Sequence, residues 1–300
     1  MSEQKPLDVA ATLNYSRSVN NHSNERWYID TITCPNGTKQ SNFENHTVTV
    51  PVTDLRAREN LANLDTTGFQ TLVAPTSFNT ECFLSDDNEE VIASYYEEVE
   101  SLLRDLTGAD EIVIFDHTFR KHNPACIETP LQREPVLRVH VDQTPVSSHD
   151  RIRYHVNDEF RNFKRFQIIN VWRPIKDIVY DYPLAMADFR TVNVAEDLVA
   201  TEVRYPPWLK DRETFAVKYN PMHKWYYWSH MQPDEVILFK CYDSFSSKLA
   251  RARKNYMTVK ENCLQDVAGF ALHTAFLNES EADLNIKRQS IEVRAIVLHM

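Results

Sequence analysis

The chain has 300 residues, of which 42% are hydrophobic and 25% charged, as is usual for a globular protein with a sizeable core. Its formal net charge of −10 and its pI near 5.6 argue against a nucleic-acid partner, which would favour a basic face. Its four glycines are too scattered for a P-loop or a dinucleotide-binding loop, which need several glycines close together. Nucleotide binding by these motifs is therefore excluded.

The cysteine count and the apolar runs bear on the expected compartment. The five cysteines are odd in number and scattered, which favours free thiols over a disulfide framework or a CxxC metal site. No run of 18 apolar residues predicts a transmembrane helix, and the first ten residues, MSEQKPLDVA, lack the apolar core of a signal peptide. We expect a cytoplasmic protein with no membrane partner.

The first fifty residues differ in composition from the rest of the chain. Residues 1–50 are polar and rich in Asn, Thr and Ser, which predicts an extended, loop-rich arm with short strands at 25–32 and 46–52. The pattern changes from residue 54, and residues 68–73 predict a strand after a turn.

Residues 84–107 carry the clearest helical pattern in the chain. Apolar residues recur at a spacing of 3.6, acidic residues gather toward the N-terminal end, and Gly108 is placed to end the helix. We expect this helix to pack on an outer face of a β core, and a short buried strand to follow at 111–116. The apolar stripe consists of Val91, Tyr95, Val99, Leu102, Leu103 and Leu106.

Strand-like segments dominate from residue 135 to the end. Because no helical patterns alternate with them, they predict a mainly β fold with helical embellishment, a sandwich or jelly roll rather than a parallel α/β sheet. Residues 243–264 predict a helical or looped excursion. We expect one domain over residues 1–300, with its β core at about 135–300. The expected strands are 136–142, 166–172, 236–242, 269–276 and 290–298.

The stretch VLRVHVDQTP at 136–145 contains a histidine and a carboxylate in alternation. Strand side chains have a period of two, so Arg138, His140 and Asp142 share one face of the predicted strand. His140 and Asp142 would supply two thirds of the 2-His-1-carboxylate site that binds Fe(II) and leaves three coordination positions open. The pair by itself also occurs by chance.

A third ligand has to come from elsewhere in the chain. His117 follows a buried strand and is one rival, while His223 and His230 flank the WYYW run, where they are more readily partners of aromatic neighbours. His273 lies inside the apolar strand-like run GFALHTAF at 269–276, as an enclosed metal ligand would require. A core histidine with satisfied hydrogen bonds would show the same pattern.

The last predicted strand has one polar face. Alternation places Arg288, Ser290, Glu292 and Arg294 together, opposite an apolar face. Arg-x-Ser suits a dicarboxylate, because a guanidinium pairs with a carboxylate through two parallel hydrogen bonds and the hydroxyl adds a third. The alternative is a solvent-facing surface on which Glu292 pairs with Arg288 or Arg294.

These elements resemble the double-stranded β-helix oxygenases that use Fe(II) and 2-oxoglutarate. Longer blocks narrow the resemblance to the AsaB-type hydroxylase/desaturase family, with its fungal gibberellin desaturase and CmcJ-like members, from about residue 50 to the C-terminus. The blocks are DTTGFQ (65–70), FDHTFRK (115–121), RVHVDQTP (138–145), INVWRPI (169–175), DYPLAMADFRTV (181–192), WYYWSHMQPDEVILFKCYDS (225–244), HTAF (273–276) and RQSIEVRAIV (288–297).

The resemblance implies a fold, cofactors and a set of site residues. It implies a double-stranded β-helix of the jelly-roll, cupin-like kind, with His140, Asp142 and His273 as ligands of Fe(II). Arg288, with Ser290, would take the distal carboxylate of 2-oxoglutarate. The segment between His273 and Arg288 is longer than is common in the superfamily, which leaves Arg294 as an alternative anchor.

The same resemblance implies an activity. A non-haem iron dioxygenase would use 2-oxoglutarate and O2, release succinate and CO2, and hydroxylate, desaturate or cyclise a small natural-product intermediate at an unactivated C–H bond. Arg138, Asn170 and Trp172 are the expected residues of the substrate pocket. Arg165 and Arg173 share the other face of the strand at 166–172, and alternation does not say which face looks inward.

Two further hypotheses compete with this one. The first is a cupin-type metalloenzyme or an oxidase that does not use 2-oxoglutarate. The second is a non-catalytic jelly-roll binding module, in which His140 and Asp142 form only a structural hydrogen bond.

Overall fold

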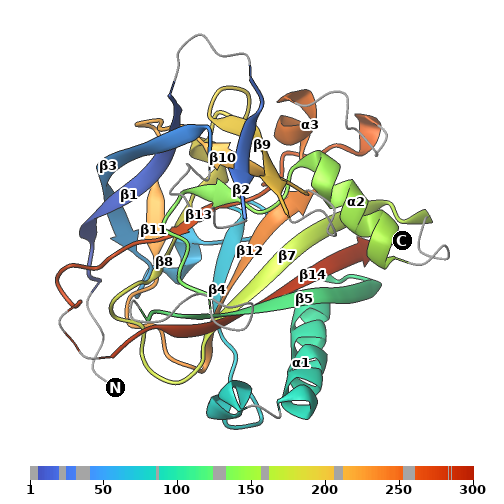
Figure 1. Cartoon of the computed structure of the whole chain (residues 1–300). Coiled ribbons are helices and arrows are strands. Elements are labelled where there is room, and N and C mark those ends of the chain that lie inside the picture. Colours follow the sequence, from blue (N-terminus) through green and yellow to red (C-terminus); the bar gives the residue numbers. More distant parts are fainter. Residues whose placement is uncertain are drawn as a thin grey trace.

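The computed structural model consists of two facing β-sheets with one long helix outside the smaller sheet (Figure 1). Buried side chains from both sheets meet in one core between them. The mainly β fold with helical embellishment is therefore confirmed. The structure describes residues 6–19, 25–31, 41–85, 88–123, 133–156, 162–205, 212–252, 261–282, 284 and 286–300.

The larger sheet has nine strands and brings together segments from the whole length of the chain. Its two edge strands are β1 and β2, and β6 and β13 lie side by side near its middle. In spatial order the strands are β1 (Val9–Ser18), β3 (Phe43–Asp54), β11 (Trp225–Tyr227), β8 (Leu184–Ala187), β13 (Leu272–Ala275), β6 (His140–Val141), β10 (Arg212–Val217), β9 (Leu198–Arg204) and β2 (Trp27–Asp30).

The smaller sheet has five strands, all antiparallel. Along its two central strands, β7 and β14, even-numbered residues face the larger sheet and odd-numbered residues face outward, as the period of two requires. In spatial order the strands are β4 (Phe69–Val73), β12 (Glu235–Asp243), β7 (Arg165–Pro174), β14 (Gln289–His299) and β5 (Glu111–Lys121).

Helix α1 (Glu89–Thr107) covers the outer face of the smaller sheet (Figure 1). Tyr95, Val99 and Leu103 are its buried residues, and Gly108 ends it in the left-handed conformation at φ 64°. The prediction of this helix and of its packing is confirmed. It begins at Glu89 rather than near residue 84, because a 3-10 turn, η2 (Thr80–Leu84), comes before it.

The packing of α1 leads to a first testable expectation. Leu103 is fully buried against the smaller sheet, so Leu103→Ala should lower the free energy of unfolding by about 3 kcal/mol. Leu106 on the same helix is 37% exposed, so Leu106→Ala should lower the free energy of unfolding by less than about 1 kcal/mol. Urea denaturation of both variants measures the difference, and equal losses would contradict this packing.

The short strands predicted at 25–32 and 46–52 are present as β2 and β3, but the loop-rich arm predicted around them over residues 1–50 is wrong where these residues are described. β1 pairs with β3 over ten residues, from Val9 opposite Val52 to Ser18 opposite Phe43. In β1 only Ala11, Leu13 and Tyr15 are buried apolar residues, and the polar residues between them lie on the more exposed face. Half-buried edge strands carry this much polar sequence, so composition misled the prediction.

Other helical segments are shorter than α1. α2 (Pro145–His155) was not among the predicted elements; it starts with a capping box between Thr144 and Ser147. In the excursion at 243–264, α3 (Ser247–Ala252) and η6 (Glu261–Cys263) are described and residues 253–260 are not. Two further 3-10 turns are η1 (Glu59–Leu61) and η4 (Phe189–Thr191).

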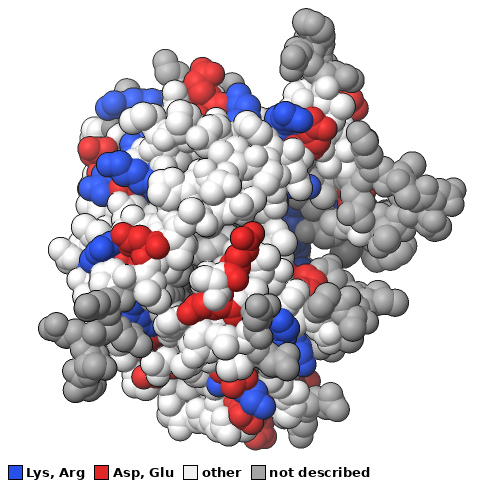
Figure 2. Space-filling model, turned by 90° about the vertical axis from the view of Figure 1, so that its left-hand side faces the viewer, with Lys and Arg blue, Asp and Glu red and all other residues white. Residues whose placement is uncertain are grey.

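On the face shown in Figure 2, charged side chains of both signs lie in several small groups, and much of this face is uncharged. Among the described residues, no helix is both long and apolar enough to cross a membrane. Cys82, Cys241 and Cys263 are free thiols, while Cys34 and Cys126 lie outside the described residues.

Candidate functional site

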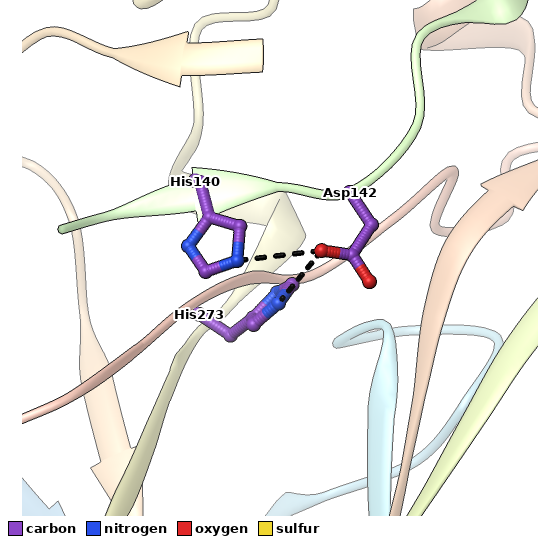
Figure 3. A group of neighbouring side chains, drawn as sticks. All are labelled: His140, Asp142 and His273. Atoms are coloured by element: carbon purple, nitrogen blue, oxygen red, sulfur yellow. Dashed lines mark ion pairs between the residues drawn. The ribbon is translucent and has the colours of Figure 1, made fainter. Parts of the chain in front are cut away.

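Three side chains from two neighbouring strands converge between the sheets (Figure 3). His140 lies on β6 and Asp142 directly follows it, while His273 lies on β13 and pairs across the ladder with His140. The Oδ1 atom of Asp142 is 3.3 Å from Nε2 of His140 and 3.7 Å from Nε2 of His273. One ligand atom from each residue therefore lies within 4.8 Å of the other two.

Backbone carbonyls orient both imidazoles. Nδ1 of His140 donates to the carbonyl of Arg138 at 2.7 Å, and Nδ1 of His273 donates to that of Ala271 at 3.1 Å. A carbonyl only accepts, so in the neutral rings the proton is on Nδ1 and the lone pair is on Nε2. Both lone pairs are thereby directed toward the carboxylate of Asp142.

Side chains of the smaller sheet form hydrogen bonds with one oxygen of the Asp142 carboxylate. Its Oδ2 atom accepts from Nδ2 of Asn170 at 3.0 Å and from Nε of Arg294 at 3.4 Å. Burial would raise the pKa of Asp142, but the contacts of His140 and His273 and the charge of Arg294 hold it well below its usual range. Asp142 is therefore an ionised carboxylate, and its Oδ1 atom makes none of these contacts with the smaller sheet.

This donor set fits a divalent first-row metal. Two neutral imidazole nitrogens and one carboxylate oxygen on one side of a point are the ligands that non-haem Fe(II) takes with open positions opposite. Arg294 and Asn170 supply the outer contacts that usually orient such ligands. The residues present can thus hold Fe(II).

A cavity that is partly open to solvent adjoins the three side chains. Its walls come from both sheets and combine charged and apolar groups. The lining residues are Arg120, Val136, His140, Asp142, Leu184, His273, Thr274, Ala275, Arg288 and Glu292.

Comparison with known proteins places this arrangement in a family. The family described as "Oxidoreductase/YMDC permease-like domain" matches residues 13–298. The chain is 32% identical to the hydroxylase/desaturase efuI of Hormonema carpetanum, covering 96% of this chain and 94% of that protein. It is 32% identical to the Fe(II)/2-oxoglutarate-dependent dioxygenase nvfI of Aspergillus novofumigatus, over 69% of this chain and 74% of that protein.

A solved structure agrees in fold over nearly the whole chain. The iron and alpha-ketoglutarate-dependent endoperoxidase NvfI superposes with a TM-score of 0.80 at 26% identity, covering 97% of this chain and 98% of that one. This chain belongs to the hydroxylase/desaturase family of Fe(II)- and 2-oxoglutarate-dependent oxygenases. The predicted family, the jelly-roll fold and the enzyme class are confirmed.

Membership of this family establishes which cofactors are used and rules out one of the competing hypotheses. The oxygenase uses Fe(II), with 2-oxoglutarate and O2 as cosubstrates, as predicted. A non-catalytic binding module is contradicted, because the named relatives are enzymes.

The last strand of the oxygenase places two arginines in different surroundings. Arg294 is paired: Nη2 donates to Glu292 at 2.5 Å and Nη1 donates to Thr118 at 2.8 Å, in addition to the contact with Asp142. Arg288 has no ion pair with any described residue. Its guanidinium donates to the carbonyl of Tyr182 at 2.9 Å and to Oγ of Ser290 at 3.3 Å.

Arg288 is a buried cation with donor capacity to spare. It is 3% exposed, lines the cavity, and lies with its guanidinium carbon 4.9 Å from the ring centre of Trp172. Burial, together with the charge of Arg120, lowers its pKa to about 9. An incoming carboxylate would offset both effects.

The predicted substrate-pocket residues divide into two groups. Asn170 and Trp172 lie on the inner face of β7, opposite Arg294 and Glu292 of β14, but neither lines the cavity. Arg138 does not line it either: its guanidinium lies 4.8 Å from the ring centre of Phe43 and donates to Asn45 at 3.2 Å. The strand expected at 136–142 is formed only at His140–Val141, so alternation does not carry back to Arg138.

The other face of β7 is occupied by structural contacts. Arg165 binds Asp243 at 2.5 Å, and Nε of Arg173 donates to the hydroxyl of Tyr95 on α1 at 3.0 Å. Neither arginine lines the cavity, so the hypothesis in which one of them meets a substrate carboxylate is wrong.

The rival histidines all have other partners. His117 bonds to the hydroxyl of Tyr96 at 2.6 Å on the outer side of the smaller sheet. His223 bonds to Asp197 at 2.9 Å, and His230 bonds to Glu281 at 2.5 Å. None of them belongs to the cluster of His140, Asp142 and His273.

Sequence reasoning missed the contribution of β5 to the site. Arg120 of this strand lines the cavity, and Thr118, which does not line it, supports Arg294. The strand was expected to end at residue 116, but it continues to Lys121. The alternation Asp116, Thr118, Arg120 within FDHTFRK was the signal that could have identified them.

Proposed function

We propose that His140, Asp142 and His273 hold Fe(II) in this oxygenase, and that Arg288 with Ser290 binds the distal carboxylate of 2-oxoglutarate. One observation carries the proposal: the three ligand atoms and the unpaired guanidinium of Arg288 open into the same cavity. A dicarboxylate spanning these two points would meet the metal with one end and a buried cation with the other.

The residues of the chain have separate tasks in this arrangement. When bound, the iron and its cosubstrates supply the oxidation of a C–H bond, with release of succinate and CO2. Asn170 and Arg294 hold Oδ2 of Asp142, which leaves Oδ1 directed at the metal position. Arg288, stacked on Trp172 and tied to Tyr182, positions the cosubstrate without having to reorganise.

We further propose that the substrate is a small natural-product intermediate. The support is the family: relatives are named hydroxylase/desaturase, and a structural neighbour is named an endoperoxidase. Hydroxylation, desaturation and oxidative cyclisation share the same first hydrogen abstraction, so all three belong to the proposed reaction class. Trp172 and Asn170, on the inner face of β7, are the proposed substrate-side wall. Incubation with 2-oxoglutarate alone should give uncoupled succinate, and no succinate under any condition would contradict the proposed role of the site.

The metal centre has a direct test. In His273→Ala, Fe(II) bound per chain should fall from near one to near zero, because one of only three protein ligands is lost. His117→Ala is the matched control, since His117 was a rival ligand and lies outside the cluster. Metal analysis after anaerobic loading gives the readout. Unchanged iron in His273→Ala, or equal losses in both variants, would argue against these ligands.

A further inference from the structure

A second arginine lies beside Arg288 on the inner face of the smaller sheet. Arg120 of β5 is directly opposite Ser290 of β14 in the antiparallel register. Side chains at directly opposed positions lie on the same face of a sheet and are near neighbours. The Ser290 hydroxyl also accepts from Nε of Arg288, so Ser290 is a neighbour of both guanidinium-bearing residues.

Arg120 faces the cavity without a carboxylate partner. It lines the cavity, and its Nη1 donates to the backbone carbonyl of Glu134 at 2.8 Å, which holds the side chain in place. Neither Arg120 nor Arg288 has an ion pair with another described residue. Burial lowers the pKa of Arg120, and the charge of Arg120 in turn lowers the pKa of Arg288, as expected of two cations close together.

The charges of the cavity are divided between two ends. At the end near Asp142, the cation Arg294 is already shared by Glu292, Asp116 and Asp142 itself. At the other end, two carboxylates act on Arg288: Glu292, which is ion-paired with Arg294, and Asp181, which accepts from the backbone N–H of Arg288 at 3.0 Å. Neither carboxylate forms an ion pair with the guanidinium of Arg120 or Arg288. Both guanidinium groups can therefore contact an additional carboxylate.

We propose that Arg120 is a second positioning residue for the cosubstrate, holding its distal carboxylate jointly with Arg288 across Ser290. This inference rests on the proposed cosubstrate site and adds a reason for its selectivity among 2-oxoacids. A carboxylate offers about four lone-pair sites, so it can accept from two guanidinium groups and a hydroxyl at once. Two neighbouring cations without carboxylate partners penalise an occupant that lacks this group, so the pair selects dicarboxylate over monocarboxylate 2-oxoacids.

The test compares two ligands that differ only in the distal group. 2-Oxoglutarate and 2-oxovalerate have the same chain length, and only the first has the second carboxylate. Calorimetric titration of the Mn(II)-loaded protein without O2 gives both dissociation constants. In Arg120→Gln, the Kd of 2-oxoglutarate should rise about tenfold or more, while that of 2-oxovalerate stays the same or falls. Arg133→Gln, an exposed arginine beside β5, controls for the loss of one positive charge.

Each other outcome has a definite meaning. Equal weakening of both ligands, or no change for either, would overturn the role of Arg120. If Arg288→Gln selectively weakens the binding of 2-oxoglutarate and Arg120→Gln does not, only the proposed role of Arg120 is wrong. If neither variant selectively weakens the binding of 2-oxoglutarate, the proposed cosubstrate site itself is wrong. Should Arg120→Gln not fold, Arg120→Lys replaces it, and a selective loss of smaller size is then expected because an ammonium cannot bind in two-point fashion.

Discussion

Arg288→Gln is expected to raise the Kd of 2-oxoglutarate about 100-fold while leaving metal binding close to that of the unchanged protein. Arg288, directly before β14, has a buried guanidinium with no carboxylate partner among the described residues. Loss of a buried, two-point charged contact is worth up to about 3 kcal/mol, or two powers of ten in affinity. The measurement is titration of the Mn(II)-loaded protein with 2-oxoglutarate in the absence of O2.

Arg294→Gln should show the opposite pattern. Arg294 supports Oδ2 of Asp142 and is already neutralised by Glu292, so we expect it to act on the metal site. Metal affinity should fall about 10- to 100-fold, the usual effect of removing a contact behind a ligand. Once saturating metal is supplied, 2-oxoglutarate should bind nearly as before.

The two variants together decide which arginine anchors the cosubstrate. Arg17→Gln, which removes an exposed arginine paired with Glu44, controls for overall charge. A selective loss of 2-oxoglutarate binding in Arg294→Gln, with Arg288→Gln unchanged, would reverse the proposed roles. Loss of metal in both would mean that the two arginines act as one supporting network.

Gly68→Ala should destabilise the fold by about 3 to 5 kcal/mol and also weaken the metal site. Gly68 has φ 92°, and an added Cβ would lie 2.4 Å from the backbone oxygen of Phe270. The backbone strain costs about 1–3 kcal/mol and the overlap a similar amount. Phe270 leads into β13, which carries His273, so relief of the overlap would displace a proposed ligand.

Gly108→Ala is the matched control for this effect. Gly108 also has a positive φ, 64°, but nothing lies within 4 Å of an added Cβ. Gly108→Ala should therefore lower the free energy of unfolding by only about 1 kcal/mol, which is the backbone strain of a non-glycine residue in the left-handed conformation. Chemical denaturation and metal titration of both variants separate backbone strain from overlap. Similar losses at both positions would show that the contact with Phe270 is not decisive.

Several features could be predicted from local sequence because a local periodicity encodes them. The stripe through Tyr95, Val99 and Leu103 determines which face of α1 is buried, whatever it packs against. The alternation from Arg288 to Arg294 puts these side chains on one face of β14, as observed. The spacing of His140 and Asp142 likewise places both on one side of β6.

Other features depend on partners far away in the chain. β6 has only two residues in the ladder, and it is held by β13 and β10, neither of which is near it in sequence. β1 is polar enough to look like a loop, and its pairing with β3 supplies the backbone hydrogen bonds that make it a strand. Local propensity cannot anticipate such pairings.

The sequence by itself determined the donor set, the polar face of the last strand and, through its motifs, the resemblance to an iron oxygenase family. Only the tertiary structure decided which face of β7 looks inward, and that Arg294 is paired while Arg288 and Arg120 share a cavity. The physical reason is that alternation assigns residues to faces within one strand. The pairing of charges depends on which strands lie opposite one another, and that is set by the packing of the two sheets.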